Sequence, residues 1–325
     1  MSSPDPTQRR LGFLFLGGAK RLTMARCLTR AAAAHGYRAD IMSYELTAEE
    51  PIAAIGRVAT GLRWSDPAVE TDIVELMHRN DLTVLLPFVD GATVVAADIA
   101  ASHPDIYCPC SSPSLTRDLF DKVSSAKLFE LNGLDIPHTF RSGMEPVFPL
   151  IAKPRFGSAS AGIRILRDRT DLDTLPSPAD YLIQEYISGA DEYTVDCFVD
   201  SHGRPTALSG RRRALTLGGE VVRTVTVDIP ALTEASRLAA TRLGLRGAFT
   251  LQYLHSNGRF LLMEINPRLG GGATASVSAG ADIASMIVEE ATGMVVAERR
   301  AVAGAVTTRC FQDVTFLPGN QVINI

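Results

Sequence analysis

Apolar runs alternate with segments of helical spacing along the first third of the chain. The apolar runs cover residues 11–18, 37–45 and 82–88, and the helical segments are 19–36, 67–80 and 91–103. Strands that are joined by helices pair in parallel, with helices on both faces of the sheet. We therefore expect an α/β domain of the Rossmann-like type over residues 1–112.

The pattern changes after residue 145, where short apolar runs follow one another directly. Runs at 148–154 and 162–168 flank a glycine-rich loop, and further runs lie at 180–187, 192–200, 204–213, 221–227, 246–254 and 258–266. Helical segments are separate from these runs, at 111–137 and 232–244. Runs of strands with segregated helices are typical of an α+β unit with a mostly antiparallel sheet.

Composition excludes several classes of protein. The chain has 325 residues and a net charge of −4, so a dedicated nucleic-acid-binding surface is not expected. Its five cysteines are odd in number and scattered, which argues against a disulfide framework and for a reducing compartment. The N-terminus lacks an apolar leader, and polar residues, Pro87 and Gly91 interrupt the longest apolar stretch. We therefore expect a cytoplasmic protein without nucleic-acid or membrane partners.

The glycine-rich loop GSASAG raises the question of phosphate binding. Gly157 and Gly162 are spaced as in a Walker loop, but Ile163 and Arg164 stand where that loop carries Lys and then Ser or Thr. Lys153 instead precedes the glycines. An earlier segment, LGGAKRL, lacks the G-x-G-x-x-G pattern of a dinucleotide-binding loop. From these residues alone, a broken Walker loop, a plain hairpin loop and another way of holding ATP all stay open.

The segment RFLLMEINPR carries the most informative polar pattern. Side chains alternate between the two faces of a strand, so Glu264 and Asn266 share one face. A carboxylate and an amide oxygen on one face, two residues apart, form an edge of hard oxygen ligands that suits Mg²⁺. Pro267 ends the strand, and Arg268 follows as a fixed cation. The alternative is an edge strand with a polar outer face.

The preceding strand offers Gln252 as a third oxygen ligand, provided that it faces the same way as Glu264. A two-residue turn at 257–258 would place Gln252 opposite Met263, on the wrong face. A three-residue loop at 256–258, with its glycine as a bulge residue, would place Gln252 on the face of Glu264. The metal hypothesis therefore predicts the three-residue loop.

Six segments follow one another in an informative order between residues 113 and 300. They are FDK, AKPRFGSASAG, LIQEYISGADEYTVD, GGEVV, TLQYL and LLMEINPRLGGG. Together they resemble the ATP-grasp superfamily, in particular stand-alone ligases similar to carbamoyl-phosphate synthase. The resemblance implies a preATP-grasp domain at 1–112, a lid subdomain with the glycine-rich loop at 113–184 and a C-terminal subdomain at 185–325. The two subdomains would enclose ATP between them.

The resemblance also implies which residues would bind ATP. Lys122 and Lys153 would contact its phosphates, Glu185 and the backbone of Ile187 would bind adenine, and Glu192 would bind the ribose hydroxyls. The loop would close over the β- and γ-phosphates through backbone N–H groups. The loop residues that it assigns to this role are Gly157, Ser158, Ala159 and Ser160.

Three oxygen-bearing residues would hold Mg²⁺ between the phosphates, with Mn²⁺ as a substitute. The resemblance assigns this role to Gln252, Glu264 and Asn266. It implies that Arg268 stabilises charge on the transferred phosphoryl group or on the acyl-phosphate.

Three consecutive arginines, residues 211–213, are harder to interpret. Arg211 and Arg213 would share a face of a strand and could hold a phosphate or a substrate carboxylate as catalytic residues. A solvated loop is the alternative. Leu217 stands where related chains often carry an arginine, so one expected contact is absent from the pattern.

The implied function is an ATP-dependent ligase that joins a carboxylate to an amine through an acyl-phosphate. Its partners would be small molecules, amino acids among them, and a homodimer is compatible with the resemblance. Carboxyphosphate or carbamoyl-phosphate chemistry is one alternative. A nucleotide-binding protein without ligase activity is another, although the chain retains Lys122, Lys153, Glu264, Asn266 and Arg268.

Overall fold

The computed structural model describes residues 8–141, 143–157, 161–218, 220–310, 312–319 and 321–323. Its N-terminal part contains the expected parallel sheet, in the order β3-β2-β1-β4. The strands are β1 (Arg9–Leu16), β2 (Tyr37–Glu45), β3 (Arg57–Thr60) and β4 (Val84–Pro87). The sequence pattern does not predict β3, because this strand is short and has no buried residue.

Helices cover both faces of this parallel sheet. This is what β1 requires, because its apolar side chains point alternately to the two faces. Phe13 and Phe15 belong to the core that includes α1 (Leu22–Ala34), whereas Leu14 and Leu16 belong to the core that includes α2 (Val69–Arg79) and α3 (Asp90–Ser102). Apolar side chains on both faces are typical of a parallel strand that is buried on both sides. The prediction of an α/β unit is confirmed.

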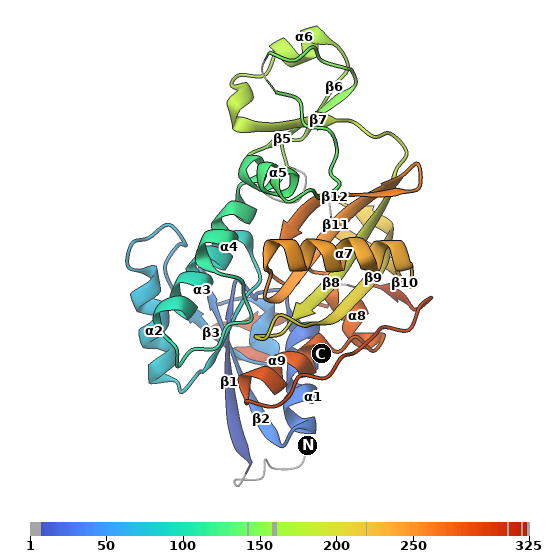
Figure 1. Cartoon of the computed structure of the whole chain (residues 1–325). Coiled ribbons are helices and arrows are strands. Elements are labelled where there is room, and N and C mark those ends of the chain that lie inside the picture. The colour runs from blue at the N-terminus through green and yellow to red at the C-terminus, as the bar shows by residue number, and fades with distance from the viewer. Residues whose placement is uncertain are drawn as a thin grey trace.

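A larger, antiparallel sheet forms the middle of the molecule (Figure 1). Among the described residues its strand order is β12-β11-β8-β9-β10-β13, and we call it the large sheet. Its strands are β8 (Asp191–Val199), β9 (Pro205–Leu217), β10 (Glu220–Val227), β11 (Gly247–Ser256), β12 (Arg259–Asn266) and β13 (Val306–Thr308). Helix α7 (Pro230–Leu243) packs on it through Leu232, Ala239 and Ala240, against Phe249 and Leu251.

A smaller sheet lies at the far end of the molecule from the parallel sheet (Figure 1). We call it the lid sheet, and its strands are β6 (Arg164–Leu166), β5 (Leu150–Pro154) and β7 (Tyr181–Glu185), in that order. It has its own small core, in which Leu150, Ala152 and Leu166 pack against α6 (Arg169–Asp173) through Leu172. Helices α4 (Pro113–Phe120) and α5 (Lys122–Leu131) precede it in the chain.

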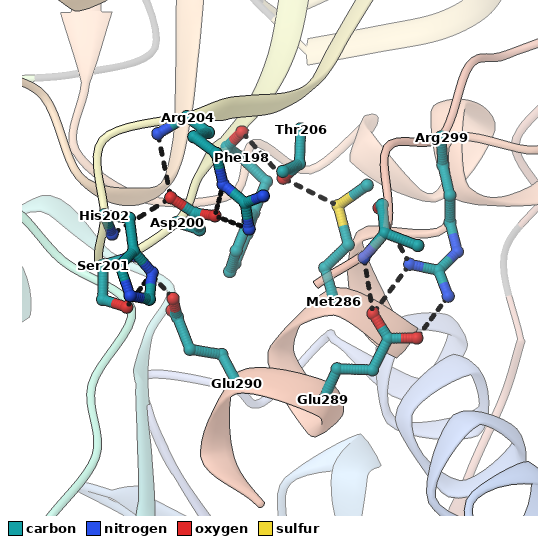
Figure 2. Close-up of polar contacts among 11 residues, drawn as sticks. Phe198, Asp200, Ser201, His202, Arg204, Thr206, Met286, Glu289, Glu290 and Arg299 are labelled. Atoms are coloured by element: carbon teal, nitrogen blue, oxygen red, sulfur yellow. Dashed lines mark hydrogen bonds and ion pairs between the residues drawn. The ribbon is translucent and has the colours of Figure 1, made fainter. Parts of the chain in front are cut away.

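Two further helices tie the large sheet to the parallel sheet. They are α8 (Ala273–Ser278) and α9 (Ile283–Ala291), and their apolar residues share one core with α1. Figure 2 shows the polar contacts of α9 with the turn after β8, where Glu290 accepts a hydrogen bond from the Ser201 N–H at 2.6 Å. Neighbouring Glu289 forms an ion pair with Arg299. The C-terminal strands β14 (Thr315–Leu317) and β15 (Gln321–Ile323) pair only with each other in the described part of the chain.

The β11–β12 hairpin corrects one prediction from the sequence. Its turn has two residues, Asn257 with φ 51° and Gly258 with φ 74°, and not the three-residue loop that the metal hypothesis requires. Positive φ at both central residues is typical of the type I′ hairpin turn. The register nevertheless shifts between Gln252 and Tyr253, so that Met263 is the extra residue and Gln252 pairs with Glu264. The bulge exists, but it lies inside the hairpin and not at its turn.

The described helices also bear on the question of a membrane span. Each of them is too short or too polar to cross a bilayer.

Candidate active site

A cavity of about 510 Å³ lies between the lid sheet and the large sheet. This volume is in the usual range for small-molecule sites. The cavity lining brings together many of the residues that the sequence singles out: Lys122, Lys153, Gly157, Glu185, Ile187, Glu192, Arg213, Gln252 and Glu264. These residues come from separate segments of the chain, so the fold assembles the cavity.

Lys153 and Glu264 line this cavity from different sheets. Lys153 lies on β5, and its Nζ donates a hydrogen bond to Gln184 Oε1 at 3.0 Å. Burial lowers the pKa of Lys153 to about 8, while the Glu264 carboxylate opposes this shift and the Lys122 ammonium adds to it. The three groups are therefore close enough to interact electrostatically, as groups around a single triphosphate would be.

Lys122 begins α5 and connects this helix to the glycine-rich loop. Its Nζ donates a hydrogen bond to the Gly157 carbonyl at 2.6 Å, and its backbone N–H donates to the Arg155 carbonyl at 3.1 Å. Asp121 caps the helix and forms an ion pair with Arg155 at 2.5 Å. Burial opposes the charged form of Asp121, but hydrogen bonds from Arg155 and Ser124 hold its pKa below the usual value. The start of the glycine-rich loop is thus anchored beside a cation.

The remaining loop residues of the phosphate prediction are Ser158, Ala159 and Ser160. They lie outside the described residues.

The end of β7, the following connection and the start of β8 line the cavity with Glu185, Ile187 and Glu192. Glu185 Oε1 accepts a hydrogen bond from the His138 backbone N–H at 2.8 Å, which fixes the carboxylate at the cavity wall. Glu192 forms an ion pair with Arg213, with 3.2 Å between Oε2 and Nε. Arg213 is the member of the arginine run that lines the cavity.

The proposed metal ligands lie on neighbouring strands. Gln252 pairs with Glu264, and Thr250 pairs with Asn266 in the same ladder. Directly opposed residues of antiparallel strands have Cβ atoms about 5 Å apart. In the described part of the chain, no group of three or more His, Cys, Asp or Glu side chains could hold a metal ion. The donor set fits a Mg²⁺ ion that takes its other ligands from phosphate and water, since Mg²⁺ prefers hard oxygens and keeps a sparse protein shell.

Arg268 and Arg211 are not among the residues that line the cavity. Arg268 follows β12 and forms an ion pair with Asp90 at the start of α3, with 2.5 Å between Nη2 and Oδ1. Arg211 is buried and binds the Asp196 carboxylate, with 2.7 Å between Nε and Oδ2. Ser276 of α8 donates a hydrogen bond to the same carboxylate. Arg211 therefore lies beneath the loop after β12, and its predicted contact with substrate stays a prediction.

Sequence reasoning missed Gln184 and Met263. Gln184 is buried on β7, where its Oε1 accepts from Lys153 and its Nε2 donates to the Pro137 carbonyl at 3.2 Å. A glutamine within the apolar run YLIQE is the signal that could have found it. Met263 lines the cavity because of the bulge in β12, a feature without a sequence signal of its own.

Comparisons with known proteins agree on one fold. Residues 177–314 match the family described as ATP-grasp in the biosynthetic pathway with Ter operon. The carbamoyl phosphate synthase large chain of Thermoplasma acidophilum is 26% identical over 165 residues, which are 46% of this chain and 16% of that protein. The chain therefore corresponds to only a small part of that relative.

Two solved structures extend the likeness over most of the chain. A biotin carboxylase complex with β,γ-ATP from Campylobacter jejuni has a TM-score of 0.70 and 17% identity, covering 87% of this chain and 71% of that one. N5-carboxyaminoimidazole synthetase from Staphylococcus aureus with ADP has a TM-score of 0.71 and 13% identity, covering 94% and 82%. The fold is thus the ATP-grasp fold. The family match over residues 177–314 and the sequence relatives agree with this fold, so the chain is similar to ATP-grasp proteins in sequence as well.

Proposed function

We propose that this protein is an ATP-dependent carboxylate–amine ligase. The observation that carries the proposal is the shared cavity of Lys122, Lys153, Gln252 and Glu264. Two ammonium groups stand near one carboxylate and one amide oxygen, which is the charge pattern that a magnesium-bound triphosphate needs. The domain ranges 1–112, 113–184 and 185–325 and the roles of the individual residues are part of this proposal.

In the proposed reaction, a carboxylate oxygen of the substrate attacks the γ-phosphorus of ATP. The bond from this phosphorus to the bridging oxygen breaks, ADP leaves and an acyl-phosphate forms. An amine nitrogen then attacks the acyl carbon, the carbon–oxygen bond to phosphate breaks, and the amine loses a proton to solvent. Phosphoryl transfer of this kind depends on positioning and charge stabilisation and needs no covalent protein nucleophile.

The residues that the sequence singles out in and beside the cavity would have separate tasks. Lys153 and Lys122 bind the phosphates, and the buried setting of Lys153 strengthens its attraction to them. Gln252, Glu264 and Asn266 would hold Mg²⁺, which when bound neutralises phosphate charge. The adenine and ribose would lie against Glu185, Ile187 and Glu192, which line the same cavity. Arg268 lies beyond the metal ligands, where it would stabilise charge on the transferred group.

A second candidate function is carboxyphosphate chemistry. The likeness to the large chain of carbamoyl phosphate synthase favours it as the alternative. In that reaction bicarbonate takes the place of the organic acid.

Release of ADP from MgATP tests the proposal against two alternatives. These are carboxyphosphate chemistry and nucleotide binding without ligase activity. The protein is assayed with a panel of amino acids and small carboxylates, each with and without an added amine, and separately with bicarbonate alone. We expect ADP release that requires an organic acid and an amine. Release with bicarbonate alone would favour carboxyphosphate chemistry, and no release with any acid would contradict ligase activity.

The matched variants for this assay are Lys153→Met and Lys127→Met. Lys127 is an exposed lysine of α5 that does not line the cavity. Lys153→Met should abolish ADP release, and Lys127→Met should leave it unchanged. Equal loss in both variants would contradict the role of Lys153.

A further inference from the structure

Cys108 and Cys110 lie close together in the segment between β4 and α4. The Cys110 backbone N–H donates a hydrogen bond to the Cys108 carbonyl at 2.8 Å, so Pro109 occupies the centre of a γ-turn. Proline suits this place because its ring fixes φ close to the value of an inverse γ-turn. Cα atoms two residues apart are at most about 7 Å from each other in an extended chain, and a turn shortens this distance. The pair therefore falls within the range of Cα separations that a disulfide spans.

The two side chains of this pair also contact each other. The Cys108 thiol donates a hydrogen bond to the Cys110 sulfur, which lowers the pKa of Cys110 although burial opposes this shift. The same hydrogen bond, together with burial, raises the pKa of Cys108. Thiolates are the nucleophiles of disulfide exchange, so Cys110 is suited to attack and Cys108 to resolve. Both residues are partly exposed, so a small molecule can reach them.

Contacts on both sides of the turn hold the pair in place. The Pro109 carbonyl accepts a hydrogen bond from the Ala248 backbone N–H, near the start of β11, at 2.9 Å. Gly247 makes this approach possible, because a Cβ atom there would lie 2.0 Å from the Pro109 carbonyl carbon. Tyr107 donates a hydrogen bond from its hydroxyl to Glu290 of α9 at 2.7 Å. The fold thus keeps the two sulfur atoms close together without further ordering of the chain.

The remaining cysteines lack this arrangement. Cys27 and Cys197 are buried, and burial raises the pKa of both thiols, which makes them poor nucleophiles. Cys310 is exposed, but it is far from the pair in the sequence. Within the described residues, no group of three or more His, Cys, Asp or Glu side chains includes the pair, so its geometry does not indicate a metal centre. The pair is also absent from the lining of the cavity between the lid sheet and the large sheet.

We propose that Cys108 and Cys110 form a reversible oxidation site that exchanges with small disulfides. A single close pair of this kind is compatible with a reducing compartment, where disulfides are transient. The site lies outside the proposed ATP cavity, so the inference does not depend on the ligase function.

Glutathione disulfide serves as the oxidant in the proposed reaction. The Cys110 thiolate attacks one of its sulfur atoms, the S–S bond breaks and one glutathione leaves as a thiolate. The Cys108 thiol then loses its proton, and its sulfur attacks the Cys110 sulfur and displaces the second glutathione. The protein gains one S–S bond, and two electrons and two protons pass from the pair to the two glutathione molecules.

Glutathione buffers of graded composition test the site on the full chain. After acid quenching, free thiols are blocked with N-ethylmaleimide and tryptic peptides are identified by mass. The peptide 80–117 contains Cys108, Cys110 and no other cysteine. In oxidising buffers we expect it to lose two hydrogen atoms and to resist blocking, and dithiothreitol should restore both thiols. A peptide that stays fully reduced in glutathione disulfide alone would overturn the proposal.

The same titration in urea separates a site built by the fold from mere closeness in the sequence. In the unfolded chain the γ-turn and its anchors are lost. The equilibrium constant for exchange with glutathione disulfide should therefore be about tenfold or more larger in the folded protein. An equal or smaller constant in the folded protein would overturn the proposal.

Three variants test the roles of the two thiols. Cys108→Ser should keep a glutathione adduct on Cys110, because the serine hydroxyl still donates to the thiolate but cannot resolve the adduct. Cys110→Ser should form its adduct on Cys108 about tenfold more slowly, since that thiol has the higher pKa. Cys310→Ser is the control, and it should form the disulfide as wild type does. Equal rates of adduct formation in the first two variants would contradict the assignment of Cys110 as the attacking group.

Discussion

Lys153 is partly buried and yet charged near neutral pH, and these two properties seldom occur together in a lysine. It is charged near neutral pH, yet burial has lowered its pKa to about 8, against the opposing effect of Glu264. A phosphate group that binds beside it stabilises the ammonium form and raises the pKa. At a pH above 8, nucleotide binding must therefore take up a proton.

The first prediction concerns the pH dependence of MgATP binding. Well below pH 8, Lys153 is protonated with and without nucleotide, so its ionisation should not change the affinity. Above pH 8 the free protein loses this proton, and affinity should fall by up to about tenfold per pH unit. Lys153→Met should bind about 100-fold more weakly at neutral pH and should lack this pH dependence, as measured by isothermal titration calorimetry. A decline above pH 8 that persists in Lys153→Met would contradict the assignment.

The second prediction concerns Glu264→Gln. The Glu264 carboxylate raises the pKa of Lys153, so its removal should lower that pKa further. The pH at which nucleotide affinity begins to fall should therefore move below 8. Titrations of the variant with ADP in the absence of Mg²⁺ measure this shift without the metal. An unchanged pH profile would mean that the two groups do not interact across the cavity.

Among the elements, the β11–β12 hairpin shows which features the sequence predicts and which it does not. The alternation of side chains predicts both strands, and the Asn257-Gly258 dipeptide indicates a turn. The location of the bulge is not predictable, because the extra residue, Met263, has no sequence signal of its own and its place depends on packing. The same holds for β3, whose short run has no apolar signature, and for the ion pair of Arg211 with Asp196.

The third prediction tests this hairpin turn. Gly258 has a φ of 74°, which costs a non-glycine residue about 1 kcal/mol. Gly258→Ala should therefore lower the free energy of unfolding by about 1 kcal/mol in urea denaturation, without changing MgATP affinity. Asn257→Gly is the matched control, and it should cost little because glycine accepts the φ of 51° at that position. Equal stability of Gly258→Ala and wild type would contradict the turn.

At the scale of the whole molecule, the alternation of strands and helices is sufficient to predict the parallel sheet and the antiparallel sheet as separate units. It does not predict how they meet, because contacts between distant segments leave no local pattern. The Arg268–Asp90 ion pair is one such contact, since it joins the loop after β12 to the start of α3. Homodimer formation and a location in the cytoplasm stay predictions.

The fourth prediction concerns the ion pair between Arg268 and Asp90. We expect Asp90→Asn to free the Arg268 guanidinium from its position and to lower kcat about tenfold, while MgATP affinity stays near wild type. The split between kcat and nucleotide affinity separates a positioning role from simple loss of folding. Asp98→Asn, on the same helix, breaks an ion pair with Arg117 instead and should leave kcat unchanged. Equal effects of both variants would contradict the role of Asp90.

A crystal structure with Mg²⁺ and a non-hydrolysable ATP analogue would locate the nucleotide. We expect its phosphates between the ammonium groups of Lys122 and Lys153 and the carboxylate of Glu264, with Mg²⁺ bound by oxygens of Gln252, Glu264 and Asn266. A nucleotide bound outside this cavity, or bound with its phosphates remote from Lys153 and Glu264, would contradict the assignment of the site and of the ligase reaction with it.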